Sequence, residues 1–224
     1  LLASADDFRI VVHGKQTHGS RPWSGVDPIV ASALIVNGLQ TIVSRQMELT
    51  ENAAVVTVGS IHGGVRSNII PERVEMVGTV RALDESMRAK IHQGVRRTAE
   101  SIAESMGATA EVTIPLTTAY PVTVNDPDLL ARMWPSLEAA AGAGNVHTAN
   151  AITGAEDFSF FAREVPGLFF FLGGKPLDVA AEEAAPHHTP DFFVDESGMR
   201  LGVRAMVRLT LDYLAAEAER QAAR

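Results

Sequence analysis

Apolar and polar positions in the first part of the chain repeat first with a strand period and then with a helix period. Phe8, Ile10 and Val12 alternate with their neighbours, a period of two that predicts a strand with one face against a core. Asp27-Pro28 supplies an N-cap followed by proline at the first helical position, which predicts a helix that ends near Arg45. The chain is therefore expected to begin with a strand followed by a helix.

The next elements complete a regular order. Residues 54–61 and 73–83 are rich in β-branched side chains and predict two strands. Asp84 is placed to cap a second helix with apolar positions at helical spacing, and Gly107 is placed to end it. Residues 110–114 predict a last strand. The order strand, helix, strand, strand, helix, strand predicts a ferredoxin-like sandwich, with an antiparallel sheet and both helices on one face.

A different pattern follows a short polar stretch at 115–121. Residues 126–141 and 156–163 predict helices, and residues 145–150 predict a short strand. Residues 168–172 are all apolar, as in a strand of a parallel sheet that helices cover on both faces. This part of the chain is therefore expected to be α/β.

A closing helix is predicted after Asp195, which can act as its N-cap. It should run through Tyr213, and its apolar positions define one face. The residues expected on that buried face are Val203, Val207, Leu211 and Leu214.

Composition limits the function classes. With 224 residues, 46% apolar and 21% charged, the chain resembles an ordinary globular protein with two modest domains, and no apolar run is long enough for a membrane span. A net charge of −8 without a Lys/Arg cluster argues against nucleic acid and favours a small substrate. Because cysteine is absent, a metal would be held by His, Asp or Glu. We expect a soluble, cytoplasmic protein.

The N-terminal residues lack the features of a natural start. The first seven residues contain no initiating Met, no basic region and no signal-like apolar core. We therefore expect this end to be a cut inside a longer chain.

The best indication of chemistry is a pair of histidines in a loop bracketed by Pro186 and Pro190. His187 and His188 follow the predicted apolar strand, where an imidazole could reach a metal. Upstream residues supply neither the carboxylates nor the second histidine that a hydrolytic metal site needs beside them.

Six motifs occur in order along the chain. They are Gly14-Lys15-Gln16-Thr17-His18-Gly19-Ser20-Arg21-Pro22, Asp27-Pro28-Ile29, Ser67-Asn68-Ile69-Ile70-Pro71, Gly78-Thr79-Val80-Arg81, Gly154-Ala155-Glu156-Asp157-Phe158 and His187-His188-Thr189-Pro190. Together they resemble the aminoacylase, hippurate hydrolase and auxin-conjugate hydrolase group of metallopeptidases. The resemblance implies a catalytic α/β domain interrupted by a smaller lid domain that dimerises. It also implies two metal ions, usually zinc with manganese or cobalt as alternatives, and hydrolysis of an amide next to a free carboxylate.

The implied fold is a ferredoxin-like lid (dimerisation) domain at 7–115, followed at 116–224 by the C-terminal portion of a zinc-peptidase-like α/β catalytic domain. Members of the group carry a first catalytic segment before the lid, with a His-x-Asp motif, a bridging acid and a Glu-Glu pair. This chain lacks a His-x-Asp motif, and we interpret Glu182-Glu183 as part of a solvated loop.

The resemblance assigns roles to five residues. His188 corresponds to a metal ligand, and His18 to a lid histidine that hydrogen-bonds the scissile carbonyl and its oxyanion. Asn68 and Arg81 correspond to the pair that recognises the substrate carboxylate. Gly154 would let the backbone approach the ligand. The alternatives are structural: loop or turn histidines, a turn asparagine, a surface strand arginine and a glycine at a helix entry.

The spacing of Asn68 and Arg81 suggests a homodimer. The two residues flank a strand, so they should lie roughly 30 Å apart in one subunit at ~3.3 Å per residue. One small ligand could not contact both. Our hypothesis is that His18 and Asn68 serve the partner's active site while Arg81 serves its own.

The predicted function is therefore that of a metal-dependent amidohydrolase cleaving N-acyl amino acids, hippurate-like conjugates or short dipeptides. Two alternatives remain open. The chain could be a non-catalytic dimerisation module, or its ferredoxin-like half could be a regulatory domain that binds a small molecule, since that fold hosts many functions.

Overall fold

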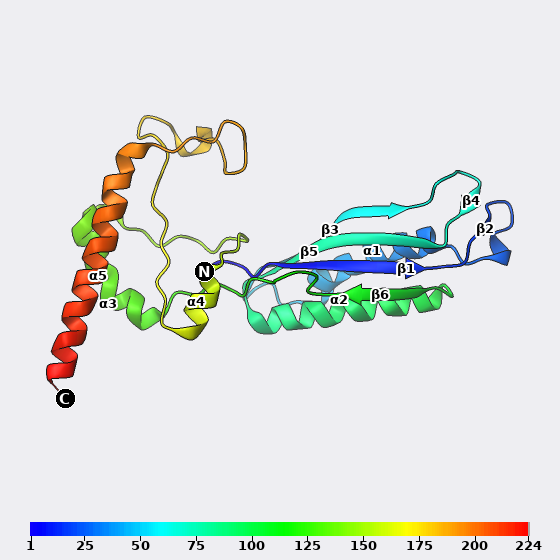
Figure 1. Ribbon diagram of the computed structural model, residues 1–224, viewed down its shortest axis with the longest axis horizontal. Coiled ribbons are helices and arrows are strands. Elements are labelled where there is room, and N and C mark those ends of the chain that lie inside the picture. Colours follow the sequence, from blue (N-terminus) through cyan, green and yellow to red (C-terminus); the bar gives the residue numbers. More distant parts are fainter. Residues whose placement is uncertain (224) are drawn as a thin grey trace. The chain divides into compact units, whose positions relative to one another are not determined.

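The computed structural model describes residues 1–223, which form two compact units (Figure 1). Unit 1 consists of Leu1–Val124 and Asn150–Glu164, and unit 2 of Asn125–Ala149 and the chain from Val165 onward. The mixture of sheet and helices confirms the predicted fold class. The domain limits 7–115 and 116–224 stay predictions.

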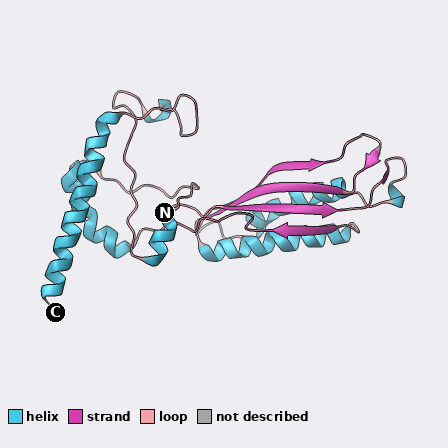
Figure 2. Cartoon of the chain, viewed as in Figure 1, coloured by secondary structure: helices cyan, strands magenta, loops and turns pink. Residues whose placement is uncertain are grey.

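Unit 1 is built on a four-stranded antiparallel sheet. Its strands are β1 (Asp6–His13), β3 (Ala54–Gly63), β5 (Arg73–Ala82) and β6 (Thr109–Thr113), in the spatial order β3-β5-β1-β6. Figure 2 shows the strands as one layer with two long helices along one face. This is the ferredoxin-like arrangement that the element order predicts.

The two helices of unit 1 begin at the predicted caps. In α1 (Pro28–Gln46) and α2 (Glu85–Ser105), the carboxylates of Asp27 and Asp84 accept hydrogen bonds from backbone N–H groups of the first turn. Gly107 has a φ of 73° just after α2, a conformation that glycine adopts without steric cost. The termini of these helices are therefore determined locally.

The sheet and both helices enclose one continuous apolar core. Phe8 of β1, Ile35 of α1 and Ile91 of α2 are completely buried, and each such side chain contributes roughly 1.5–3 kcal/mol by leaving water. Gly78 of β5 is required in this core, because a Cβ there would overlap the Phe8 ring. Unit 1 therefore supplies its own burial partners.

A buried ion pair lies at the base of unit 1, by which we mean the end of the sheet near the N-terminus. Asp6 accepts hydrogen bonds from Arg88 at 2.8 and 2.9 Å, and His92 Nε2 lies 3.3 Å from its carboxylate. Burial is the largest single influence on the pKa of Asp6 and raises it, but the contacts with His92 and Arg88 together outweigh it and hold the pKa below its ordinary value. Glu85 also binds Arg88 and accepts from the Val122 N–H at 2.9 Å, which ties the connecting segment to α2.

At the opposite end of the sheet from the N-terminus, two short strands form the tip of unit 1 (Figure 1). β2 (Thr17–His18) pairs antiparallel with β4 (Ile69–Ile70), and the 3-10 helix η1 (Pro22–Ser24) follows β2. We use the name lid tip for β2, the turn that leads from it to η1, η1 itself, and β4 with the loop just before it.

Unit 2 contains the helices α3 (Pro127–Ala141) and α5 (Met199–Ala222), whereas α4 (Phe158–Glu164) belongs to unit 1. α3 and α5 pack around a small apolar cluster and are linked by a 2.6 Å ion pair between Arg132 and Glu217. Three 3-10 turns complete the unit: η2 (Ala143–Asn145), η3 (Ala181–Glu183) and η4 (Glu196–Gly198). Among residues 1–223, none of the helices has both the length and the apolar character of a membrane span.

Two strands predicted for unit 2 are wrong. Residues 145–150 contain the end of η2 and irregular chain, and residues 168–172 are assigned to none of the described strands. A strand needs a ladder partner for its backbone groups. Near 168–172 the Asn125 side chain takes the place of such a partner, because its amide exchanges two hydrogen bonds with the backbone of Phe169 at 2.7 and 2.8 Å.

The predicted buried face of the closing helix is also wrong. Asp195 caps η4, which runs directly into α5, so the predicted start is close to the observed one. The residues expected inside are largely exposed, because α5 packs through the opposite side around Ala205. Their exposed fractions are 67% for Val203, 52% for Val207, 61% for Leu211 and 58% for Leu214.

Candidate functional site

Two predicted site residues meet at the lid tip. His18 pairs with Ile69 in the β2–β4 ladder, and the N–H of Gly19 donates to the Asn68 carbonyl at 2.7 Å. A Cβ on Gly19 would come within 3.1 Å of the Asn68 backbone, so glycine permits this close approach. His18 and Asn68, which are fifty residues apart in sequence, thus lie side by side and exposed.

The His18 ring is held by its own loop. Its Nδ1 accepts a hydrogen bond from the Ser20 N–H at 3.1 Å and lies 2.8 Å from the Ser20 hydroxyl. The Arg21 N–H closes the turn by donating to the His18 carbonyl at 2.8 Å. The ring therefore has a defined orientation despite its exposure.

Arg81 lies at the other end of the sheet from the lid tip. It sits near the end of β5 opposite Val55, on the face that the helices do not cover. Eight residues separate it from Arg73 at the tip end of the strand, about 26 Å at ~3.3 Å per residue. Arg81 is partly exposed, and among the described residues no hydrogen bond or ion pair engages its guanidinium.

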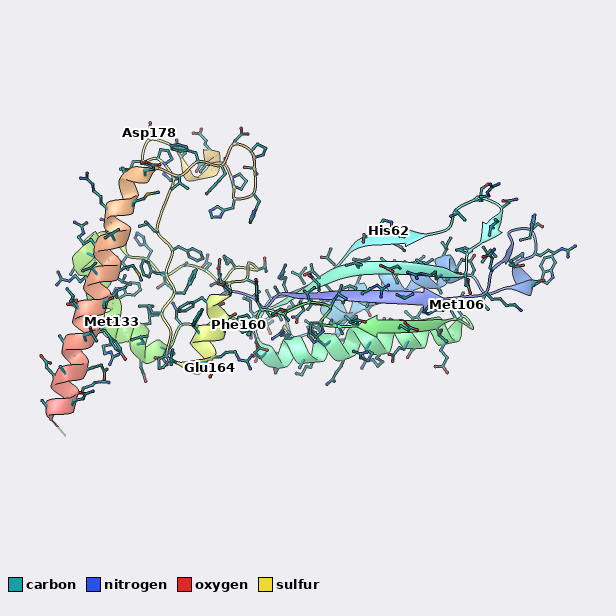
Figure 3. All side chains as sticks on the ribbon, in the orientation of Figure 1. His62, Met106, Met133, Phe160, Glu164 and Asp178 are labelled. Atoms are coloured by element: carbon teal, nitrogen blue, oxygen red, sulfur yellow. The ribbon has the colours of Figure 1, made fainter. Side chains whose placement is uncertain are left out.

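Gly154 lies at this same base of unit 1. Two residues before it, Ile152 pairs with Leu2 and accepts from the Ala3 N–H at 3.1 Å, while the Ser4 N–H donates to the carbonyl of Ala82, next to Arg81. The α4 helix that follows is anchored by Phe160 (labelled in Figure 3), whose ring meets Tyr120 edge-to-face at 5.9 Å. Space around Gly154 is ordinary, with only the Ile152 side chain near.

The predicted residues of unit 1 therefore form two groups. His18 and Asn68 lie together at the lid tip, whereas Arg81 and Gly154 lie at the base, at the opposite end of the sheet. The structure does not bring these groups together within one unit.

His188 lies in unit 2, in a tight turn. Its φ of 63° is left-handed, a conformation that costs energy for a residue with a Cβ and is enriched at functional sites. The Thr189 hydroxyl closes the turn on the Pro186 carbonyl at 2.8 Å, and the neighbouring His187 ring packs 4.5 Å from that of Phe192. His188 is exposed.

The side chains in residues 1–223 do not by themselves form a metal centre. No group of three or more His, Asp or Glu side chains gathers within this part of the chain, and His188 is the ligand that the resemblance assigns. A hydrolytic zinc site uses three protein ligands. No reaction step through a metal follows from these residues alone.

Sequence reasoning missed the role of Ser20. The motif placed it in the loop, but periodicity carries no information about contacts between residues two positions apart in a turn. The available signal was a serine two residues after a candidate histidine, across a glycine, because serine side chains in turns readily form local hydrogen bonds.

Comparison with known proteins supports the resemblance to these metallopeptidases. Residues 3–106 match the family model described as peptidase dimerisation domain. Thermostable carboxypeptidase 2 of Saccharolobus solfataricus is 38% identical over 213 residues, covering 95% of this chain and 52% of that protein. N-acetylcysteine deacetylase of Bacillus subtilis is 36% identical over 214 residues, covering 94% and 52%.

Solved structures agree. A crystal structure from methicillin-resistant Staphylococcus aureus, assigned as an aminohydrolase, matches with a TM-score of 0.81 and 29% identity over 96% of this chain and 54% of that one. A dinuclear metal-binding peptidase of the M20 family from Bacillus subtilis matches with a TM-score of 0.67 and 30% identity over 93% and 49%. Residues 3–106 thus match a peptidase dimerisation domain, and the predicted resemblance to these metallopeptidases is confirmed. The chain spans about half the length of the relatives it matches.

Proposed function

We propose that this chain supplies the substrate-positioning groups of a metal-dependent amidohydrolase that cleaves N-acyl amino acids or dipeptides with a free carboxylate. The observation that carries the proposal is that His18 and Asn68 lie side by side at the exposed tip of a unit that matches a peptidase dimerisation domain. The names of two relatives, thermostable carboxypeptidase 2 and N-acetylcysteine deacetylase, are consistent with this substrate class and support the proposal.

The residues have suitable chemistry for such a substrate. The His18 ring can donate a hydrogen bond to a carbonyl oxygen and stabilise the negative charge that develops there. The amide group of Asn68 can donate to a carboxylate, and the Arg81 guanidinium can bind a carboxylate through two parallel hydrogen bonds. Gly154 leaves the backbone open at the same end of unit 1 as Arg81.

The cofactor in this proposal is a divalent metal. Zinc is the first candidate, with manganese and cobalt as alternatives, and His188 is the proposed ligand from this chain. Neutral imidazole is a good ligand for these metals. The remaining ligands are not found among residues 1–223.

The two groups of residues support a homodimer. Along β5 alone, Arg73 at the end nearest the lid tip and Arg81 at the base are about 26 Å apart at ~3.3 Å per residue, so one small ligand cannot contact both ends of the sheet. In a two-fold dimer, the tip of one subunit can reach the site at the base of the other. We propose that His18 and Asn68 act in trans and Arg81 in cis.

The proposed dimer contact is the free edge of the unit 1 sheet. β3 is an edge strand with Val55 exposed, and α1 beside it exposes Ile29, Val30 and Leu34. An exposed edge strand with apolar neighbours is a site for pairing with a second copy.

A specific observation also favours a second candidate, a non-catalytic dimerisation module. Residues 3–106 match a peptidase dimerisation domain, which is the part that such a module needs. The regulatory small-molecule domain has no comparable observation in its favour.

A chimera separates the two candidates. The matching segment of Bacillus subtilis N-acetylcysteine deacetylase is replaced by these 224 residues, and release of free amine from N-acetylcysteine, hippurate and dipeptides is measured with zinc, manganese or cobalt. The amidohydrolase proposal predicts release that His18→Ala abolishes. A folded, dimeric chimera that releases no amine from any of these substrates would support the non-catalytic module.

Mixing variants of the active chimera tests the arrangement in trans. A His18→Ala subunit paired with an Arg81→Ala subunit regains one intact site if the tip serves the partner. Random re-pairing of equal amounts should restore about one quarter of the unmutated activity, because half the dimers are mixed and each has one working site. If His18 and Arg81 act within one subunit, mixing restores nothing.

A further inference from the structure

The contacts between His18 and Ser20 determine which ring nitrogen carries the proton. A neutral imidazole has one N–H donor and one acceptor nitrogen. The backbone N–H of Ser20 can only donate, and it points at Nδ1 at 3.1 Å. Nδ1 must therefore be the acceptor, and the proton must reside on Nε2.

The Ser20 hydroxyl reinforces this choice. Its oxygen lies 2.8 Å from the same Nδ1, and because that nitrogen has no proton, the hydroxyl must be the donor. Two donors from one residue thus converge on Nδ1 and leave the Nε2–H side of the ring without a partner among the described residues.

We propose that Ser20 is a positioning residue that holds His18 as the Nε2–H tautomer, with this N–H presented outward as a hydrogen-bond donor. The inference deepens the proposed function and rests on it for its biological meaning. A substrate carbonyl oxygen, which becomes negatively charged during amide hydrolysis, needs a donor. The opposite tautomer would present a lone pair and repel it.

The surrounding backbone makes the arrangement rigid. Arg21 N–H donates to the His18 carbonyl at 2.8 Å, and Gly19 N–H donates to the Asn68 carbonyl at 2.7 Å. The loop is thus fixed on both sides of the His18–Ser20 pair. His18 and Asn68 then present their donors from neighbouring positions at the lid tip.

The test is a measurement of tautomers on the 224-residue chain. Long-range ¹H–¹⁵N correlation of the imidazoles is recorded at a pH of about 8.5, where free imidazoles are neutral. The chain has seven histidines, so the His18 signal is assigned by its loss in His18→Gln. We expect Nδ1 of His18 to show the shift of an acceptor and Nε2 that of a protonated nitrogen.

Three variants complete the test. Ser20→Ala removes the hydroxyl and should lower the ratio of Nε2–H to Nδ1–H by about fivefold, the effect of one neutral hydrogen bond. Ser20→Thr keeps the hydroxyl and should retain the wild-type ratio. Ser24→Ala, an exposed serine of the same tip, should leave it unchanged.

A protonated Nδ1 in the wild type, or a Ser20→Ala ratio equal to that of the wild type, would overturn the inference. The measurement needs no catalysis. A chain with the expected tautomer but a chimera without amidase activity would contradict only the proposed function, and the reverse result would contradict only the role of Ser20.

Discussion

Unit 1 and unit 2 both have helices with apolar faces but bury those faces to very different extents. In unit 1, the apolar faces of α1, α2 and the sheet enclose Phe8, Ile35 and Ile91 completely. In unit 2, the apolar face of α5 around Leu211 is exposed, and the core reduces to a small cluster between α3 and α5. An amphipathic pattern thus identifies a face that is suited to burial, but not the partner that buries it.

The greatest loss of stability is expected at a buried position of α2, and an exposed position of α5 provides the contrast. Ile91→Ala in α2 should lower the free energy of unfolding by about 4 kcal/mol, because a fully buried side chain leaves a cavity. Leu211→Ala in α5 should change it by less than about 0.5 kcal/mol, because that side chain is already in water. Urea unfolding followed by circular dichroism measures both. Equal losses would mean that α5 is buried in the folded protein.

The second expected effect concerns the ion pair at the base of unit 1. Asp6→Asn should lower the free energy of unfolding by about 3 kcal/mol at pH 7, because it leaves Arg88 without its buried partner. Asp7→Asn, an exposed neighbour, is the matched control.

The pKa of Asp6 adds a pH dependence. Because this pKa is lower in the fold than its ordinary value of 3.8, the stabilisation is complete above about pH 4 and is lost as the pH falls through the folded value. Urea midpoints between pH 7 and pH 2.5 should therefore fall more steeply for the wild type than for Asp6→Asn. Parallel curves would show that Asp6 is not the responsible group.

A smaller effect is expected in the core of unit 2. Leu137→Ala should cost about 2 kcal/mol, because its surroundings are only partly closed and can relax. Hydrogen exchange should accelerate in α3 and α5 and remain unchanged in α1 and α2. Acceleration throughout the chain would contradict the division into two units.

The smallest effect on stability is expected on the exposed face of α5. Val207→Glu together with Leu211→Glu should increase solubility without altering the unfolding of unit 1, because the substitutions reduce an exposed apolar patch. Gln221→Glu adds charge without removing an apolar group and serves as control. The concentration that remains soluble in polyethylene glycol measures the difference. A loss of stability in unit 1 would contradict this account.

The fold of unit 1 could be predicted because its helices carry their own start signals and its apolar faces find their burial partners within the unit. Asp27 and Asp84 gave the helix starts, and the alternation of Phe8, Ile10 and Val12 gave the buried face of β1. In unit 2 the same reasoning failed for residues 168–172. Their apolar run predicts a strand, but the hydrogen bonds go to the Asn125 side chain, a tertiary contact that periodicity does not contain.

The candidate site could be predicted only through its motifs. Nothing in the periodicity brings His18 next to Asn68, because β2 and β4 are only two residues long and their pairing depends on the fold. The separation of this pair from Arg81 did follow from strand length. The Ser20 contacts with His18 could not, since they depend on the conformation of a single turn.

We propose that unit 1 joins two copies of this chain through the β3 edge, and sedimentation equilibrium of the 224-residue protein is the measurement that decides it. The expected mass is about twice the chain mass of 23.9 kDa. The mass should fall to that of one chain when Leu34→Lys and Val55→Lys place charges on that surface, whereas Val203→Lys in unit 2 should remain dimeric. A folded wild-type protein with the mass of one chain, or a double variant that still dimerises, would refute the proposal.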